Sequence, residues 1–410
     1  MALDFIPFVA AFAGTVFIQD VPSPSTFTSK EKPVASHKVR NEKSLANDAE
    51  IQPLSKLDSE RAADDLWKAR SAEVKKTRAA EVDARVITHG DKTMKFFYKT
   101  YGQKPHDGHS LFLSLHGGGN AEPDINDQQY ENQKRLYKPE EGVYLAPRAP
   151  TNTSDLWHQF HIDRLFERLI EDMVVFEGVN PDRVYLMGYS AGGDGVYQVA
   201  PRMADRLAAA AMMAGHPNEA SPLGLRNLPF AIHVGANDSE YDRNNVARAW
   251  GDKLAKLRAN DEQGYVHICE IHPNRGHWMH REDASAVPWM AKFRRNATPL
   301  KVVWYQDDVT HDRFYWLAVP DGKAKKGALA IVAIQGQNVL IEEAKNIETL
   351  ILRFDDRLLD LDQPIHVRMN GQTLFTGKLP RTLATLKKTL EGPGDRRLMF
   401  CSEIAVVIPK

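Results

Sequence analysis

The stretch RVYLMGYSAGGDGVYQVAPRM, residues 183–203, changes character at one serine. Its first part is apolar and β-branched, which predicts a buried strand. Its second part starts with glycines and continues as a helix-compatible run. Ser190 stands where the two parts meet, between Gly188 and Gly192. The stretch therefore predicts a sharp strand-to-helix turn that holds a serine hydroxyl outward.

The flanking sequence continues this alternation of strand and helix over residues 84–298. Apolar runs predict further strands at 93–101, 110–119, 142–150, 207–215, 229–238 and 265–272. Apolar residues at helical spacing predict helices at 162–176, 244–257 and 281–293. Apolar strands that alternate with amphipathic helices indicate an α/β fold, a doubly wound, mostly parallel sheet with both faces covered. Ligand chemistry in such a sheet lies at the carboxyl ends of its strands.

A serine hydroxyl becomes a useful nucleophile when it is exposed and next to a base. The Gly-x-Ser-x-Gly spacing provides the exposure, because only tiny side chains fit beside so tight a turn. The amide of Ala191 would open the following helix and lack an intrahelical acceptor, so it can bind developing negative charge. A second strand ends in His116-Gly117-Gly118-Gly119. We expect Gly118 or Gly119 to supply the second oxyanion donor.

An acid and a base follow at two later strand ends. Asp238 is the last residue of the run 229–238 and lies just past the end of the strand that this run predicts. Glu240 and Asp242 are the alternatives. His277 follows the next strand behind a glycine, with His272 and His280 as alternative bases. The chain order Ser190, Asp238, His277 predicts a catalytic triad along one edge of the sheet.

These motifs resemble those of the α/β-hydrolase superfamily, and within it the compact esterases related to poly(3-hydroxybutyrate) depolymerases and feruloyl esterases. The resemblance covers about residues 84–297. It implies Ser190 as nucleophile, Asp238 as acid and His277 as base. It also implies an oxyanion hole built from Ala191 with Gly118 or Gly119. The sequence departs from the hormone-sensitive-lipase branch at Tyr189, where that branch usually has Asp.

The resemblance implies a serine hydrolase that cleaves carboxylic esters through an acyl-enzyme intermediate. A serine peptidase with the same triad and a non-catalytic binding protein on a hydrolase fold are the alternatives. The short connection between the strands near residues 215 and 229 leaves no room for a helical cap, so we expect an open site for small or polymer-attached esters. Trp157, His158 and Tyr189 are expected to bind substrate, although core packing is an equal alternative for the residues around Trp157.

Composition limits the partners and cofactors of the chain. The net charge is −1 and the pI about 7, so bulk charge predicts neither nucleic-acid binding nor a strong attraction to membranes. The two cysteines, Cys269 and Cys401, cannot make a disulfide framework. We expect no cofactor and no metal, since the pairs His158/His161 and His277/His280 lack supporting ligands. The sequence makes no prediction of oligomeric state.

The ends of the chain predict further segments. Residues 1–21 are an apolar N-terminal segment, so the protein is expected either in the cytoplasm or exported through that segment. Residues 22–83 are a polar linker followed by a helical extension. Residues 299–410 carry short strand signals and an Asn370-Gly371 hairpin turn, which predict an all-β, sandwich-like accessory domain. The aromatic residues between Trp304 and Trp316 are interpreted as either a polymer-binding face or core.

Overall fold

The computed structural model describes residues 50–409, which belong to one compact unit. The predicted apolar segment at 1–21 and most of the polar linker lie outside the described residues. The division at residue 298 into a catalytic and an accessory domain stays a prediction.

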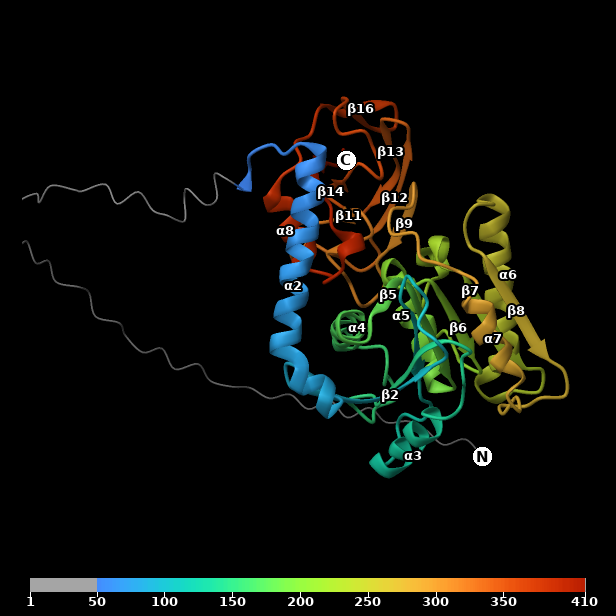
Figure 1. Ribbon diagram of the computed structural model, residues 1–410. Coiled ribbons are helices and arrows are strands. Elements are labelled where there is room, and N and C mark those ends of the chain that lie inside the picture. The colour runs from blue at the N-terminus through green and yellow to red at the C-terminus, as the bar shows by residue number, and fades with distance from the viewer. Residues whose placement is uncertain (1–49, 410) are drawn as a thin grey trace, which may run out of the picture. The chain divides into compact units, whose positions relative to one another are not determined.

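An eight-stranded sheet forms the centre of the first two thirds of the described chain (Figure 1). Its strands lie in the order β1-β2-β4-β3-β5-β6-β7-β8. β1 and β2 pair antiparallel, β2 meets β4 antiparallel, and every later pairing is parallel. The predicted α/β class with a mostly parallel sheet is confirmed. The strands are β1 (Val86–His89), β2 (Lys92–Tyr101), β3 (His109–Leu115), β4 (Gly142–Pro147), β5 (Val179–Tyr189), β6 (Ala209–Met213), β7 (Phe230–Gly235) and β8 (His267–His272).

Both faces of the sheet are buried at its centre, where every residue of β3, β4, β6 and β7 is buried. Along β3, Leu111 and Leu113 enter one apolar core, while Phe112 enters a second core on the other face. The first core takes side chains from α4, α5 and α6, and the second from α3 and α7. The helices are α3 (Pro123–Gln133), α4 (Phe160–Asp172), α5 (Ala191–Arg202), α6 (Arg243–Asn260) and α7 (Ala286–Met290).

Helix α3 was not predicted from the sequence. Its eleven residues, PDINDQQYENQ, hold few apolar side chains, so no helical periodicity marks them. Pro123 at its first turn is the one local signal, because proline is tolerated there. The helix lies after the glycine loop that follows β3.

Residues 299–409 form two smaller sheets, drawn in orange and red in Figure 1. One has the strand order β16-β15-β13-β12-β9 and the other β10-β11-β14-β17. Asn370 and Gly371 both have positive φ, as the predicted type I′ hairpin turn between β15 and β16 requires. The strands are β9 (Lys301–Tyr305), β10 (Arg313–Phe314), β11 (Leu317–Ala318), β12 (Leu329–Gln335), β13 (Asn338–Lys345), β14 (Thr349–Phe354), β15 (Ile365–Met369), β16 (Gln372–Gly377) and β17 (Ser402–Val407).

One expectation about this region needs correction. The region is not all-β, because helix α8 (Leu383–Glu391) precedes β17. Of the two interpretations of the aromatic residues, core is the one that fits, because Trp304, Phe314 and Trp316 are buried in the apolar core. The Nε1 of Trp316 donates to the carbonyl oxygen of Pro299, which satisfies its one polar atom.

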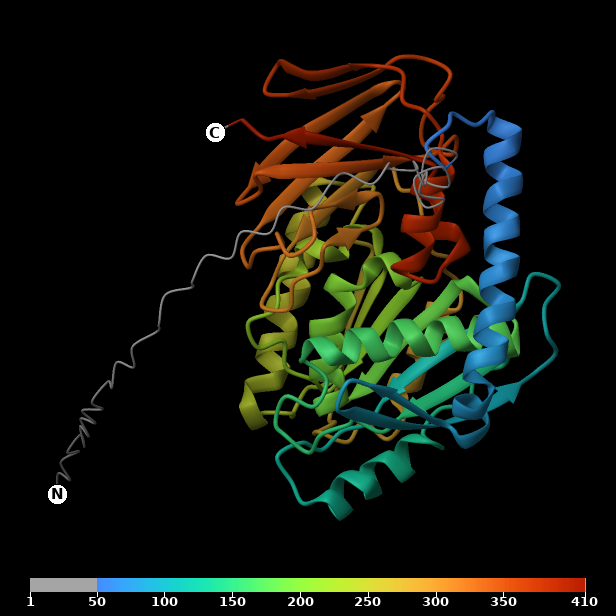
Figure 2. The ribbon, with the colours of Figure 1, turned by 90° about the vertical axis from the view of Figure 1, so that its left-hand side faces the viewer.

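The long helix α2 (Lys56–Ala84) lies beside both the main sheet and residues 299–409 (Figure 2). Buried polar contacts attach α2 to α4. Arg78 donates a hydrogen bond to Asp172, the last residue of α4, at 3.1 Å. Another buried cluster joins the two parts of the described chain, since Asp395 accepts hydrogen bonds from Arg206 and Arg295 at 2.9 and 2.7 Å. None of the helices within residues 50–409 is long and apolar enough to cross a membrane.

Candidate active site

Ser190 lies in the turn between β5 and α5, as the sequence predicts. Its backbone has φ 58° and ψ −124°, a strained conformation for a residue other than glycine. Glycine is required on both sides by close approach. A Cβ on Gly188 would lie 2.2 Å from the carbonyl oxygen of Gly192, and one on Gly192 would lie 2.2 Å from that of Leu115. The glycines thus allow β3, β5 and α5 to meet tightly beneath the half-buried serine.

Three residues from distant strand ends form one hydrogen-bonded row. His277 Nε2 lies 3.0 Å from Ser190 Oγ, and His277 Nδ1 lies 2.9 Å from Asp238 Oδ2. An ionised carboxylate only accepts hydrogen bonds, so Nδ1–H donates to Asp238 and Nε2 is left to accept the Ser190 proton. This is the tautomer in which the imidazole can act as a base towards the hydroxyl.

The side chains of Asp238 and His277 differ in how far they are exposed to solvent. The Asp238 side chain is buried, and Arg243 Nη1 lies 3.6 Å from its second oxygen. The His277 side chain is 39% exposed, so its outer edge meets the solvent side of the cleft. The alternative acids Glu240 and Asp242 are exposed and make no contact with His277.

Neither alternative base reaches Ser190. His272 Nε2 bonds His233 Nδ1 at 3.1 Å, and its other ring nitrogen lies 3.4 Å from Glu282. His280 is exposed beside the ring of Trp278. Of His272, His277 and His280, His277 is the one that forms a hydrogen bond with Ser190.

The glycine loop after β3 offers one amide rather than two. Gly119 N–H donates to the buried Asn126 Oδ1 at 2.8 Å. Within residues 50–409, no hydrogen bond uses the amide of Gly118, which lines the space at Ser190 with φ +102°. Ala191 provides the first amide of α5 on the other side of the serine. Gly118 and Ala191 are therefore the pair of amides available to an oxyanion.

Buried rings fix this loop from below. The Nδ1–H of His116 donates to Gly117 O, and its Nε2 accepts from the amide of Ala149. Burial lowers the pKa of His116 to about 4, so the ring is neutral near pH 7. Trp157 Nε1 donates to His116 O at 3.0 Å. Trp157 is completely buried and does not line the cleft, so its expected substrate contact was wrong and the core alternative is correct.

Tyr189 both lines the cleft and holds the loop of the base. Its hydroxyl donates to His277 O at 2.6 Å and accepts from the amide of Met279 at 3.1 Å. Burial raises the pKa of Tyr189, which keeps the hydroxyl protonated as this bonding requires. A tyrosine next to the nucleophile thereby fixes the position of the imidazole.

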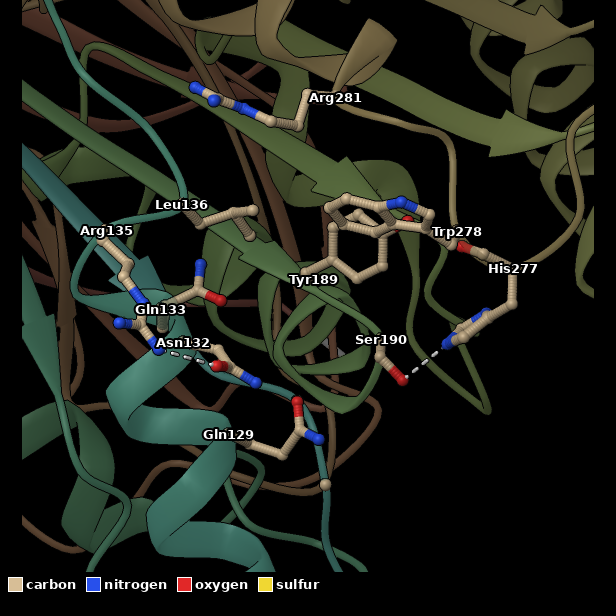
Figure 3. Close-up of a pocket in the computed structure, with 12 residues that line it drawn as sticks. Gln129, Asn132, Gln133, Arg135, Leu136, Tyr189, Ser190, His277, Trp278 and Arg281 are labelled. Carbon is tan, nitrogen blue, oxygen red and sulfur yellow. Dashed lines mark hydrogen bonds between the residues drawn. The ribbon is translucent and has the colours of Figure 1, made fainter.

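Two cavities meet at Ser190. The arginine cavity, about 590 Å³, lies beside Tyr189 and His277 and none of its lining residues is acidic (Figure 3). The acidic cavity, about 510 Å³, lies beside Ala191 and includes His158, whose expected contact with substrate stays a prediction. Its lining carboxylates are Asp155, Asp194 and Glu219. The arginine cavity is lined by Gly117, Gly118, Gln129, Asn132, Gln133, Arg135, Leu136, Tyr189, Ser190, His277, Trp278 and Arg281.

Several cleft residues were not anticipated from the sequence. Asn126, Arg135 and Arg281 lie outside the predicted motifs, and no local pattern marks them. Trp278 is 46% exposed at the mouth of the arginine cavity. Its position directly after His277 was the one signal available.

No protein-family model matches this sequence, and a search of curated proteins found no match. Solved structures similar to the chain include a thermostable esterase, with a TM-score of 0.38 and 16% identity. The overlap spans 51% of this chain and 62% of that esterase.

Two further neighbours are of the same kind. A feruloyl esterase module from Clostridium thermocellum has a TM-score of 0.37 and 15% identity over 51% of this chain and 86% of its own. A poly(3-hydroxybutyrate) depolymerase from Bordetella parapertussis has a TM-score of 0.38 and 14% identity over 50% and 87%. These neighbours belong to the esterase group that the sequence resembles. What this chain does has to be argued from its own site.

Proposed function

We propose that the protein is a serine hydrolase that cleaves carboxylic esters. The observation that carries the proposal is the row of two hydrogen bonds from Ser190 through His277 to Asp238, at 3.0 and 2.9 Å. A buried carboxylate, a correctly oriented imidazole and a strained serine that lines the cleft are the parts that acyl transfer needs.

The reaction has two halves. His277 Nε2 takes the proton of Ser190 as Oγ bonds to the ester carbonyl carbon, and the carbonyl π electrons move onto its oxygen. That oxyanion accepts hydrogen bonds from the amides of Ala191 and Gly118. The tetrahedral intermediate then collapses, its C–O bond to the alcohol breaks, and His277 protonates the leaving alcohol. Water repeats the sequence on the acyl-enzyme and releases the acid.

The two cavities at Ser190 differ in charge, so the acyl part and the alcohol part of a bound ester meet different surroundings. Arg135 and Arg281 line the arginine cavity, and among the ion pairs of residues 50–409 neither takes part. Two unpaired guanidinium groups and no carboxylate favour a substrate that carries an anionic group on that side. We infer that esters with a carboxylate at this end are preferred.

The length of the β6–β7 connection supports access by bulky esters. Only the short helical turn Pro222–Asn227 interrupts it, so no cap covers Ser190 from this connection. A polymer-attached ester therefore fits the proposal as well as a small one does.

A fluorophosphonate probe and p-nitrophenyl esters test the proposal. The probe should label Ser190, and Ser190→Ala should abolish labelling and lower kcat by about 10⁴- to 10⁶-fold. Aminoacyl p-nitroanilides in the same series separate a peptidase from an esterase. A folded wild-type protein that neither takes the label nor hydrolyses any ester would overturn the proposal and favour a non-catalytic role.

A further inference from the structure

A second cluster of ligating side chains lies under the loops that carry Asp238 and His277. His233 on β7 pairs in register with Glu270 on β8, and Gly235 pairs with His272. His233 and His272 each stand five residues before a member of the triad, Asp238 and His277 respectively. The cluster therefore connects the two strands just before the acid and the base leave them.

The spacing of the ligand atoms matches that of a tetrahedral metal site. His233 Nδ1 lies 3.1 Å from His272 Nε2 and 3.6 Å from Glu270 Oε2. All three ligand atoms lie within 4.8 Å of one another. Zinc–nitrogen and zinc–oxygen bonds of about 2.0–2.2 Å in tetrahedral geometry put ligand atoms about 3.3–3.5 Å apart. The distances from His233 to His272 and to Glu270 are close to this spacing, and the exposed Glu270 side chain can turn to bring its oxygen nearer to His272.

The surroundings of the two imidazoles favour metal binding over a simple pair of hydrogen-bonded rings. His233 is fully buried, and its Nδ1, the atom that would bind the ion, faces His272 Nε2 and Glu270 Oε2. His272 Nδ1 lies 3.4 Å from Glu282, the carboxylate contact by which proteins orient a zinc-bound histidine.

We propose that His233, His272 and Glu270 bind one zinc ion that clamps β7 to β8. Two imidazole nitrogens and one carboxylate oxygen are a ligand set that suits zinc, with water in the fourth position. The ion lies below the triad and takes no part in acyl transfer. Its effect is to fix the relative position of the two strands that carry Asp238 and His277. No metal is expected from the sequence, where the pairs His158/His161 and His277/His280 are the only candidates considered. The ligands proposed here come from two separate strands and make no local motif.

The test uses the full chain, stripped with a chelator and titrated with Zn²⁺ against a chromophoric competitor. One equivalent should bind, and excess Zn²⁺ should raise the Tm, since the ion binds the folded form. Mg²⁺ alone should do neither, because it prefers an all-oxygen, octahedral site. Glu270→Gln and His272→Gln should each weaken Zn²⁺ binding about tenfold or more, since removing even an indirect ligand contact costs that much.

Matched variants control for unspecific binding. His267 lies on the same strand and bonds only Tyr265 O, so His267→Gln should bind Zn²⁺ as the wild type does. Glu270 is exposed, so Glu270→Gln should fold even if His272→Gln does not. Failure of the wild type to bind one equivalent would overturn the proposal. The proposal would also be overturned if Glu270→Gln bound Zn²⁺ as the wild type does while Asp238→Asn lost binding. That result would place the ion at the triad.

Discussion

Tyr189 carries two functions in one side chain. Its ring lines the arginine cavity, and its hydroxyl bridges the carbonyl of His277 and the amide of Met279. The residue next to the nucleophile thus determines where the base lies. A displacement of about 1 Å between reacting groups can cost up to 100-fold in rate.

Tyr189→Phe should therefore lower kcat about tenfold or more while KM for a small ester changes little. The ring stays in place, but two hydrogen bonds to the His277 loop are lost. Steady-state kinetics on a p-nitrophenyl ester measure both constants. Tyr98→Phe is the matched control, because its hydroxyl bonds Glu177 away from the cleft. Equal kcat losses in both variants would show that Tyr189 acts through general stability alone.

The sequence predicts that Ser190, Asp238 and His277 meet, because each follows its own strand at a short distance, and the structure places the three in one hydrogen-bonded row. Strand, glycine turn and polar residue are all local signals. Asn126 could not be predicted, since its contact with Gly119 depends on how α3 folds back on the glycine loop. Trp157 was misassigned because an aromatic residue in a loop has the same sequence whether it points into the cleft or, as here, under His116.

At the scale of elements, the cleft lies between the glycine loop with α3 on one side and the His277 loop on the other (Figure 3). Arg135 follows the C-terminal end of α3, and Arg281 follows the His277 loop. The strand pattern predicted the edge of the sheet where the site lies. It could not predict the charge of the cleft, because that charge comes from connections whose paths the periodicity does not determine.

Removing the arginines should weaken hydrolysis of anionic esters selectively. Arg135→Gln and Arg281→Gln should each lower kcat/KM for p-nitrophenyl hemisuccinate about two- to fivefold, the equivalent of an exposed ion pair of ~0.2–1 kcal/mol. p-Nitrophenyl butyrate, of equal acyl length without the carboxylate, should be unaffected. Raising the salt concentration should reduce the difference between the two esters.

Arg248→Gln on α6 is the control for this experiment, because Arg248 does not line the arginine cavity. If butyrate is hydrolysed but the hemisuccinate gains nothing from the arginines, the inference about substrate charge fails and ester hydrolysis stands. If neither ester is hydrolysed, the proposed function itself fails.

Across the whole molecule, a buried ionic cluster ties the end of the chain to the main sheet. Asp395 lies between Arg206 and Arg295, and all three side chains are 1% exposed. Burial alone would raise the pKa of Asp395. The two guanidinium groups outweigh that effect and hold its pKa below the ordinary value. The cluster depends on residues about a hundred positions apart or more, so no sequence window contains it.

Asp395→Asn should destabilise the protein by about 3–5 kcal/mol, because it leaves the buried Arg206 without its ion-pair partner and removes one of the two carboxylates that Arg295 contacts. Urea unfolding at pH 7 measures the loss. Asp64→Asn is the matched control. Asp64 is exposed and pairs with Arg396 at 2.8 Å, so its loss should change stability by less than ~1 kcal/mol. Similar losses in both variants would contradict the assigned role of the buried cluster.

The same cluster predicts how stability depends on acid. The folded-state pKa of Asp395 is depressed, so its contribution is complete above the unfolded-state pKa of about 3.9 and is lost as pH falls below it. The wild type should therefore lose stability more steeply than Asp395→Asn when pH is lowered from about 4. Unfolding curves for both proteins across that range check the sign.

Asp395 also restricts how a gene for this protein can be rearranged. A crossover that replaced its 3′ end would have to return a carboxylate to this position or leave the buried Arg206 without its ion-pair partner. Fusion partners added beyond the last strand escape that restriction. The residues of the main sheet and residues 299–409 therefore have to be kept together in any rearranged gene.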